Sequence, residues 1–150
     1  MSQKEWGNIT WLLFHSLAEK IDDNSFSIVK DQLIYFIKYT CENLPCPICA
    51  NHATETLKSG NINLINKKSD LIEFLRQFHN IVNDTLNKET IGKIYVIQKY
   101  KKANIFNIIQ QFIKIYSIKY SNVGTLKLIK SHHRDNYLHK AKSYLQFFIK

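Results

Sequence analysis

The sequence predicts an all-α protein, and three observations support that fold class. The chain of 150 residues contains only four glycines and two prolines, too few for a turn-rich β fold. Apolar residues recur every three or four positions along most of it, which is the period of an amphipathic helix. The apolar content of 45% is enough for a buried core. We therefore expect a four-helix bundle with a short fifth helix and additional C-terminal helices.

The first two helices are predicted over about residues 6–20 and 26–43. The first carries an apolar stripe formed by Trp11, Leu12, Phe14, Leu17 and Ala18. The sequence Asp22-Asp23-Asn24-Ser25 then interrupts the pattern with residue types that cap helices. The second stripe comprises Phe26, Val29, Leu33, Ile34, Phe36 and Ile37, and ends near Asn43-Leu44-Pro45.

The third and fourth helices follow with only one polar stretch between them. The third is expected to begin at Cys46 and to stop at Gly60, and residues 61–68 read as a loop. Ser69 and Asp70 are expected to open the fourth helix, with Glu73 three positions after Asp70 as in a capping box. The stripe of the fourth helix consists of Leu71, Phe74, Leu75, Phe78, Val82 and Leu86.

The rest of the chain is also expected to be helical, over about residues 93–102, 104–120 and 131–150. No repeat and no linker divides the sequence. We expect residues 1–103 to form the core domain. We expect residues 104–150 to be a helical extension that packs on the same domain or lies at a dimer interface.

The most informative motif is Cys46-Pro47-Ile48-Cys49. Pro45 and Pro47 are the only prolines of the chain, and proline suits the first turn of a helix. Two thiols three positions apart at a helix start can close into a disulfide with little backbone movement, and the helix N-terminus favours a thiolate. The motif therefore predicts a reactive dithiol at Cys46 and Cys49, and its role depends on the rest of the chain.

The composition argues against several other classes of protein. Its formal charge of +9 comes mainly from lysine, and Arg76 and Arg134 are the only arginines, so nucleic-acid binding is not expected. No stretch is apolar for the length of a membrane span. Residues 1–5 lack the hydrophobic region of a signal peptide, so we expect a cytoplasmic location.

Two predicted helices place imidazole groups beside aromatic or amide groups. Trp11 and His15 are four residues apart on the first helix, and so are His79 and Asn83 on the fourth. Each residue could simply belong to the core, as most such tryptophans and histidines do. Together they would also suit a flat aromatic cofactor, which needs apolar walls and a few aimed polar groups.

Zinc is the main alternative reading of the cysteines. Cys41, Cys46, Cys49 and His52 could form a Cys3His set, which would make the chain a structural or interaction protein. The chain has ample apolar residues, however, whereas local zinc sites usually serve domains short of core. A thioredoxin-like fold would need strands before its CxxC, and none is apparent. We therefore expect no metal site.

Three motifs resemble the Erv/ALR family of FAD-linked sulfhydryl oxidases. They are the segment from Trp6 through Gly7, Thr10, Trp11 and His15 to Ala18; the CxxC followed by His52; and His79-Asn80-Ile81-Val82-Asn83 with Leu86 and Lys88. The motifs occur in the family's order and spacing over about two thirds of the chain. The compact form, rich in Ile and Lys, is similar to versions encoded by large DNA viruses. A viral origin would imply a location in the host cytoplasm or in a virion.

The resemblance implies a fold, a cofactor and a reaction. It implies a helical bundle that holds FAD at one end and forms a homodimer. It implies that electrons pass from two thiols through the Cys46–Cys49 disulfide to FAD and then to molecular oxygen, giving hydrogen peroxide. The electron donor would be a thiol-bearing protein substrate or a thioredoxin-like protein.

The resemblance also assigns cofactor contacts residue by residue. The expected FAD-binding residues are Gly7, Thr10, Trp11, His15, His52, His79, Asn80, Val82, Asn83, Leu86 and Lys88. Lys88 would lie near the pyrophosphate, and Phe74 stands where many members of the family have tryptophan. Thiol chemistry points to Cys46, nearer the helix end, for exchange with substrate, and Cys49 would face the flavin.

The chain departs from the family pattern in two places. Many members carry a second, shuttle pair of cysteines, but this chain has no cysteine before Cys41 or after Cys49. Electrons would therefore come directly from a partner, unless Cys41 helps; we expect Cys41 to be a buried, inert thiol. The extension over residues 104–150 is longer than the family core needs.

Overall fold

The computed structural model of the chain confirms the predicted all-α class. It describes the backbone of residues 3–121 and 127–149 and the side chains of residues 5–118 and 136–149. The described residues form helices and no β-strand: α1 (Gln3–Lys20), α2 (Asp23–Glu42), α3 (Pro47–Ser59), the 3-10 helix η1 (Ile62–Leu64), α4 (Lys68–Thr85), α5 (Lys93–Lys101), α6 (Ile105–Ser121) and α7 (Lys127–Phe148). None of these helices is both long and apolar enough to cross a membrane.

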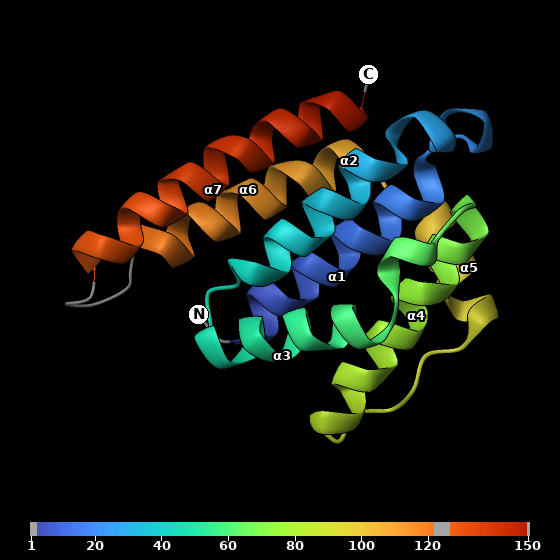
Figure 1. Ribbon diagram of the computed structural model, residues 1–150, viewed down its shortest axis with the longest axis horizontal. Coiled ribbons are helices and arrows are strands. Elements are labelled where there is room, and N and C mark those ends of the chain that lie inside the picture. The colour runs from blue at the N-terminus through green and yellow to red at the C-terminus, as the bar shows by residue number, and fades with distance from the viewer. Residues whose placement is uncertain (1–2, 122–126, 150) are drawn as a thin grey trace.

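The helices surround α1, which is the central element of the fold. Helix α1 packs against α4, α5 and α6, while α2 packs against α3 and α7. Figure 1 shows α6 and α7 as an antiparallel pair that runs along α1 and α2, with α3 and α4 on the other side of the molecule. All six residues from 13 to 18 of α1 are buried, so this part of the helix is covered on every side.

The chain enters and leaves α3 for different physical reasons. Cys46 is the N-cap of α3 and Pro47 is its first residue, as the two prolines predict. The helix ends at Gly60, but Gly60 has φ −81° and the left-handed conformation belongs to Asn61, with φ 58°. Gly60 is needed for space, because a Cβ there would lie 2.8 Å from the ring of Phe74. The loop predicted after Gly60 contains η1, whose Ile62 is buried.

Helix α4 begins at Lys68, with Lys67 as its N-cap, just before the Ser69-Asp70 pair expected to open it. Asp70 is therefore the third residue of the helix rather than its cap, and its carboxylate accepts the backbone N–H groups of Asn66 and Lys67. These hydrogen bonds hold the pKa of Asp70 below its usual value. Glu73, expected in a capping box, instead bonds Arg76 one turn later. The predicted capping box is wrong in register because Asp70 already satisfies the free amides.

The C-terminal helices are fastened to the bundle by two buried pairs of hydroxyl groups. The Tyr116 hydroxyl on α6 lies 2.5 Å from that of Thr10 on α1, and the Tyr137 hydroxyl on α7 lies 2.6 Å from that of Thr40 on α2. All four residues are buried. Helix α7 begins at Lys127, before the predicted position 131, while residues 122–126 and 150 of the predicted extension lie outside the described residues.

We predict that Tyr137→Phe lowers the free energy of unfolding by about 1–2 kcal/mol, because a buried hydroxyl that loses its partner keeps its desolvation cost. Thr40 is fully buried, so its hydroxyl cannot turn to water instead. Urea unfolding at neutral pH measures the effect. The change Thr40→Val should cost a similar amount, and the double variant should cost less than the sum. Tyr35→Phe, on an exposed tyrosine of α2, is the control. Additive losses in the double variant would contradict the pairing.

Candidate active site

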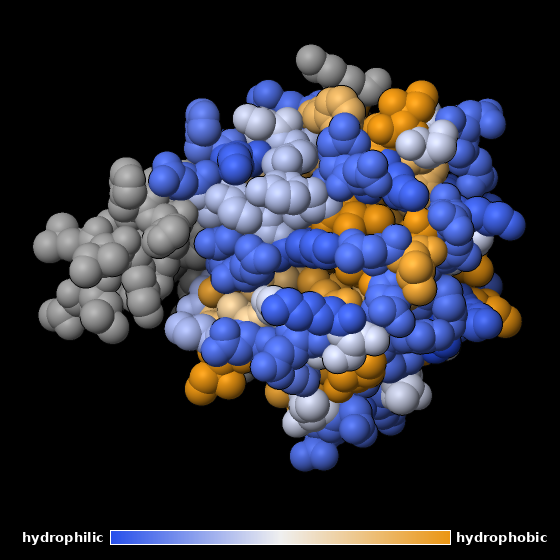
Figure 2. Space-filling model, viewed as in Figure 1, coloured by the Kyte–Doolittle hydropathy of each residue, from blue (hydrophilic) through white to orange (hydrophobic). Residues whose placement is uncertain are grey.

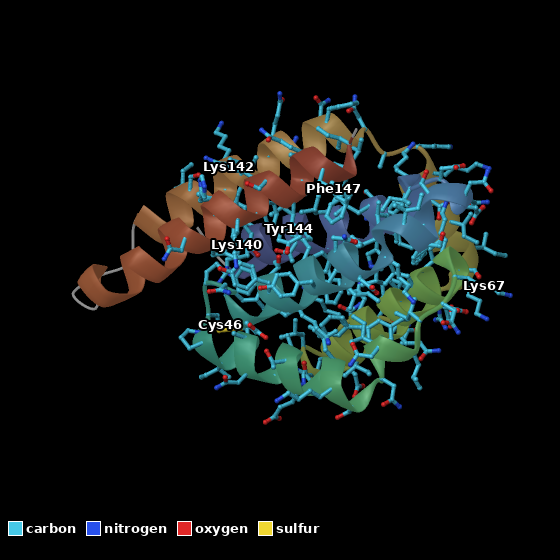
Figure 3. All side chains as sticks on the ribbon, turned by 45° about the horizontal axis from the view of Figure 1, so that its top comes forward. Cys46, Lys67, Lys140, Lys142, Tyr144 and Phe147 are labelled. Atoms are coloured by element: carbon cyan, nitrogen blue, oxygen red, sulfur yellow. A yellow bond between two sulfur atoms is a disulfide. The ribbon has the colours of Figure 1, made fainter. Side chains whose placement is uncertain are left out.

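Cys46 and Cys49 form a disulfide at the N-terminus of α3. Their Cα atoms are 5.2 Å apart, within the range that a disulfide requires. Both residues are half-buried and pack against the apolar core, whereas Ile48 between them is 81% exposed. Figure 3 shows Cys46 at the very start of α3. A partner thiol can therefore approach the pair from the end of the helix.

The start of α3 also stabilises negative charge on the sulfur of Cys46. The backbone N–H of Cys49 donates to Cys46 Sγ at 3.3 Å, so this sulfur occupies the N-cap position. Free amides and the helix dipole both favour an anion there. A thiolate formed at Cys46 is therefore more stable than in an unstructured chain, which is the condition for rapid thiol–disulfide exchange.

A cluster of stacked rings joins α1 to α4 and α5. The rings of Trp11 and His79 are parallel within 7° with centroids 4.1 Å apart, and His15 Nε2 lies 3.0 Å from His79 Nδ1. On its other side His15 stacks on Tyr100 of α5, at 4.6 Å between centroids. The structure thus brings together Trp11, His15 and His79, the three residues that the sequence placed on two separate helix faces.

Both histidines of this cluster are held neutral at physiological pH. Burial lowers the pKa of His15 to about 3, and the nearby charges of His79 and Lys99 act in the same direction. Burial also lowers the pKa of His79 to about 4, with Lys99 and Lys88 contributing. His15 Nδ1 is buried and has no hydrogen-bond partner among the described residues. The cluster therefore combines flat neutral rings with two adjacent ammonium groups.

Asn80 and Asn83 hold the connection between α4 and α5. The side-chain oxygen of Asn80 accepts the N–H of Ile91 at 2.7 Å, and its amide donates to the Ile91 carbonyl at 3.1 Å. Asn83 donates to the carbonyl of Glu89, while the carbonyl of Asn83 accepts the N–H of Lys88 at 2.8 Å. These four bonds place Lys88 close enough to His79 to affect its pKa. The contacts expected between Asn80, Asn83 and FAD stay predictions.

The remaining sequence-predicted residues lie in different environments. Gly7 is half-buried one turn before Trp11, and a Cβ there would meet nothing within 4 Å. Thr10 is buried against α6, with its hydroxyl bonded to the Trp6 carbonyl and Tyr116, so it does not share the face of Trp11. His52 and Val82 are half-buried, and Leu86 is 43% exposed at the end of α4. None of these placements tests a role in cofactor binding.

Tyr100 and Lys99 are site residues that sequence reasoning missed. Tyr100 is 2% exposed and stacks on His15, and the charge of Lys99 lowers the pKa of both histidines. The only available signal was the spacing of Val96 and Tyr100, four residues apart and both buried on the short helix α5. That pattern indicates a packed helix, but it does not indicate which side chain the tyrosine meets.

The geometry gives no support to the alternative zinc site. Cys46 and Cys49 are paired with each other, and Cys41 is a free cysteine that is only 2% exposed. Over residues 3–121 and 127–149, no group of three or more His, Cys, Asp or Glu side chains is arranged to hold a metal ion. Burial raises the pKa of the Cys41 thiol far above its ordinary value, with the charge of Glu42 adding to the shift.

An exchangeable disulfide at a helix start, set in the same core as a cluster of flat rings, defines a helical thiol–disulfide redox protein. Comparison with protein families identifies the family within this class. The family model described as Erv1 / Alr matches residues 8–101, and the chain belongs to that family. The match covers α1 to α5 and ends before α6 and α7 begin.

Viral proteins are among the most similar relatives. Protein 096R of Invertebrate iridescent virus 3 is 29% identical over 65% of this chain and 67% of its own length. A relative from African swine fever virus is 34% identical over 58% of this chain and 72% of its own length. OPG072 of Variola virus is 28% identical over 63% of this chain and 97% of its own length. All three names include the words FAD-linked sulfhydryl oxidase, without qualification for the swine fever virus relative. No solved structure is a significant match.

We predict that the protein loses stability as the pH falls from 6.5 toward 4. In the unfolded chain both histidines titrate near 6.5, so that state takes up protons that the folded state refuses. Their stabilising contribution is complete above pH 6.5 and decreases below it. The free energy of unfolding should be about 2 kcal/mol lower at pH 5 than at pH 7, mostly from His15, since His79 is partly exposed.

Urea unfolding at the two pH values measures this dependence. The variant His15→Asn should show a clearly weaker pH dependence, whereas His139→Asn, on an exposed residue of α7, should behave as the natural sequence does. An unchanged pH dependence in His15→Asn would show that burial of this imidazole is not its source.

We predict that Cys41 does not react with iodoacetamide in the folded protein. Its thiol is buried and its pKa is raised, so the reactive thiolate is scarce and out of reach. After mild reduction, mass spectrometry should find label on Cys46 and Cys49 only, and urea should expose the third site. The variant Cys41→Ala provides the matched control for the mass of the third adduct. Labelling of Cys41 at the same rate as Cys46 would contradict its burial.

Proposed function

We propose that the chain is an FAD-linked thiol oxidase that forms disulfides in partner proteins. The observation that carries this proposal is the Cys46–Cys49 disulfide at the N-terminus of α3 in a member of the Erv1/Alr family. The words FAD-linked sulfhydryl oxidase in the names of its relatives support the same activity. We propose molecular oxygen as the final electron acceptor and hydrogen peroxide as its product.

The ring cluster fits an isoalloxazine cofactor in chemical terms. Trp11 and His79 offer flat faces for stacking, and the buried His15 Nδ1 offers a polar atom without another partner among the described residues. Lys88 and Lys99 place positive charge next to these rings, which suits a pyrophosphate. Asn80 and Asn83 would act by positioning Lys88. When bound, FAD would supply the two-electron acceptor for the reduced cysteine pair and the reaction with oxygen.

The cysteine pair carries out the exchange with substrate. A substrate thiolate attacks Cys46, the Cys46–Cys49 bond breaks, and Cys49 leaves as a thiolate at the helix start. A second substrate thiolate attacks the substrate sulfur of this mixed disulfide and displaces Cys46. The substrate has then lost two electrons and gained a disulfide, while Cys46 and Cys49 have become a dithiol. The N-cap position of Cys46 stabilises the thiolate that leaves in the second step.

The chain has no second pair of cysteines to relay electrons. Its third cysteine, Cys41, is buried with a raised pKa and is therefore a poor nucleophile. We propose that thiols of a protein substrate, or of a thioredoxin-like donor, react with Cys46 directly. A homodimer stays a prediction, and the faces of α1 and α2 that α6 and α7 cover are not available to form one.

We predict that Cys46→Ser and Cys49→Ser each abolish oxygen consumption with dithiothreitol, because exchange requires both sulfurs. Both variants should remain yellow, since neither cysteine is among the proposed cofactor contacts and most of those contacts lie on α1, on α4 and after α4. An oxygen electrode measures turnover, and the visible spectrum before and after denaturation measures bound flavin.

The variant Cys41→Ser is the matched control, because it removes the buried sulfur and should leave turnover unchanged. A colourless natural protein that consumes no oxygen would disprove the proposed function. Near-normal turnover in either active-pair variant would disprove the assignment of the pair.

A further inference from the structure

The positive charge of the chain is concentrated in its C-terminal extension. Residues 104–150 contain eight of the 21 Lys and Arg residues but only one of the 12 Asp and Glu residues, so they carry +7 of the formal +9. The residues before position 104 are close to neutral as a group. The family match ends at residue 101, so this charge belongs to the part of the chain that lies outside the match.

Part of this extension forms an open groove against α2. Gln32 of α2 and four residues of α7, Lys140, Ser143, Tyr144 and Phe147, line a cavity of about 240 Å³. Figure 3 shows Lys140, Tyr144 and Phe147 in succession along α7, and Figure 2 shows hydrophobic surface beside the C-terminal end of that helix. Phe147 is 44% exposed and adds apolar surface to the groove.

The groove continues into an aromatic surface that holds an ammonium group. Lys140 Nζ lies 5.3 Å from the ring centroid of Tyr39 and 5.9 Å from that of Tyr35, which is itself 42% exposed. Tyr35 also contacts Tyr144, at 5.6 Å between centroids. No carboxylate is paired with Lys140 in the described part of the chain, so the aromatic rings orient its charge without neutralising it.

This surface leads to the exchangeable disulfide. Tyr39 lies on the last turns of α2, Asn43 donates to its carbonyl, and Cys46 follows three residues after Asn43. Cys46 is seven positions after Tyr39, so at most about 25 Å lies between their Cα atoms. Figure 1 shows the end of α2 close to the start of α3, and Figure 3 shows Lys140 and Cys46 at this same end of the molecule. An extended segment of about seven residues can therefore touch both places.

We propose that the groove between α2 and α7 docks an acidic segment of the protein substrate while the thiols of that substrate reach Cys46. The proposal rests on the proposed function and adds the substrate class. A carboxylate would pair with Lys140, and apolar groups beside it would lie on Tyr144 and Phe147. The lining offers a single cation beside the apolar side chains of Tyr144 and Phe147, which suits a segment that mixes carboxylates with apolar groups better than the continuous phosphates of a nucleic acid.

Two dithiol peptides that differ only in charge test this proposal. Each carries a Cys-Gly-Ser-Cys pair and, about six residues away, a run of glutamates in one peptide and of lysines in the other. The acidic peptide should have the lower KM, and the difference should shrink when salt screens the charges. Dithiothreitol serves as the small substrate, because it has no acidic segment that could dock in the groove.

The decisive variant is Lys140→Gln. It should raise the KM for the acidic peptide about twofold to fivefold, as expected for the loss of one exposed charge pair, and leave kcat and dithiothreitol turnover unchanged. Lys67→Gln is the matched control, since it removes the same charge at the start of α4, on the opposite side of the molecule from Lys140 in Figure 3. Equal effects of the two variants would overturn the proposal.

A direct binding measurement separates this proposal from the proposed function. Fluorescence anisotropy of the acidic peptide, made with serines in place of its cysteines, reports docking whether or not the protein oxidises thiols. Tighter binding of this peptide than of its lysine counterpart, weakened by the α7 variant only, supports the groove. Binding of a single-stranded oligonucleotide that is tighter than that of the acidic peptide and equally sensitive to the α7 variant would overturn it in favour of nucleic acid.

Discussion

The arrangement of the other helices follows from one requirement, which is that residues 13–18 of α1 must be shielded from water on every side. Six consecutive residues of this helix are buried, including the polar residues His15 and Ser16, and no single neighbour can cover a helix on all sides. Helices α4 and α5 cover one part of α1, and α6 covers another. On the side of α2, the ring centroids of Phe14 and Phe36 are 6.4 Å apart. The ring cluster and the attachment of the extension are both consequences of this constraint. One helix thus presents Trp11 and His15 to the site and Thr10 to α6.

The motif from His79 to Lys88 contributes a ring to the stacked cluster and also fixes the connection between α4 and α5. His79 places its ring in the cluster, while Asn80 and Asn83 use their amides on the backbone of the connection that carries Lys88. Arg76 adds a further bond to the carbonyl of Ile91. A connection between two helices would otherwise leave its carbonyl and amide groups to water, with no defined position for the lysine. The two asparagines therefore fix the backbone that carries Lys88.

Local signals in the sequence were enough to predict the helices and the disulfide. The apolar period located α1, α2, α4 and α6, and the prolines beside Cys46 predicted where α3 begins. Errors arose where competing local interactions decided the outcome, as with Asp70, which caps α4 from its third position, and with the 3-10 helix η1, which lies in the segment expected to be a loop. The meeting of Tyr100 with His15 could not be predicted, because they are 85 positions apart and nothing local encodes their contact. The contact of Lys140 with the rings of Tyr35 and Tyr39 could not be predicted for the same reason.

The burial of Cys41 has a consequence for how the chain acquires its disulfide. A newly made chain offers three thiols, and the short separations between them allow any two to pair. Completing α2 turns Cys41 into the core, where it packs away from oxidants, while Cys46 stays at the exposed start of the next helix. Folding therefore selects the correct pair by removing the competitor. Oxidation that precedes folding would instead trap isomers in which Cys41 is bonded to Cys46 or Cys49. In those isomers Cys41 could not take its buried position on α2.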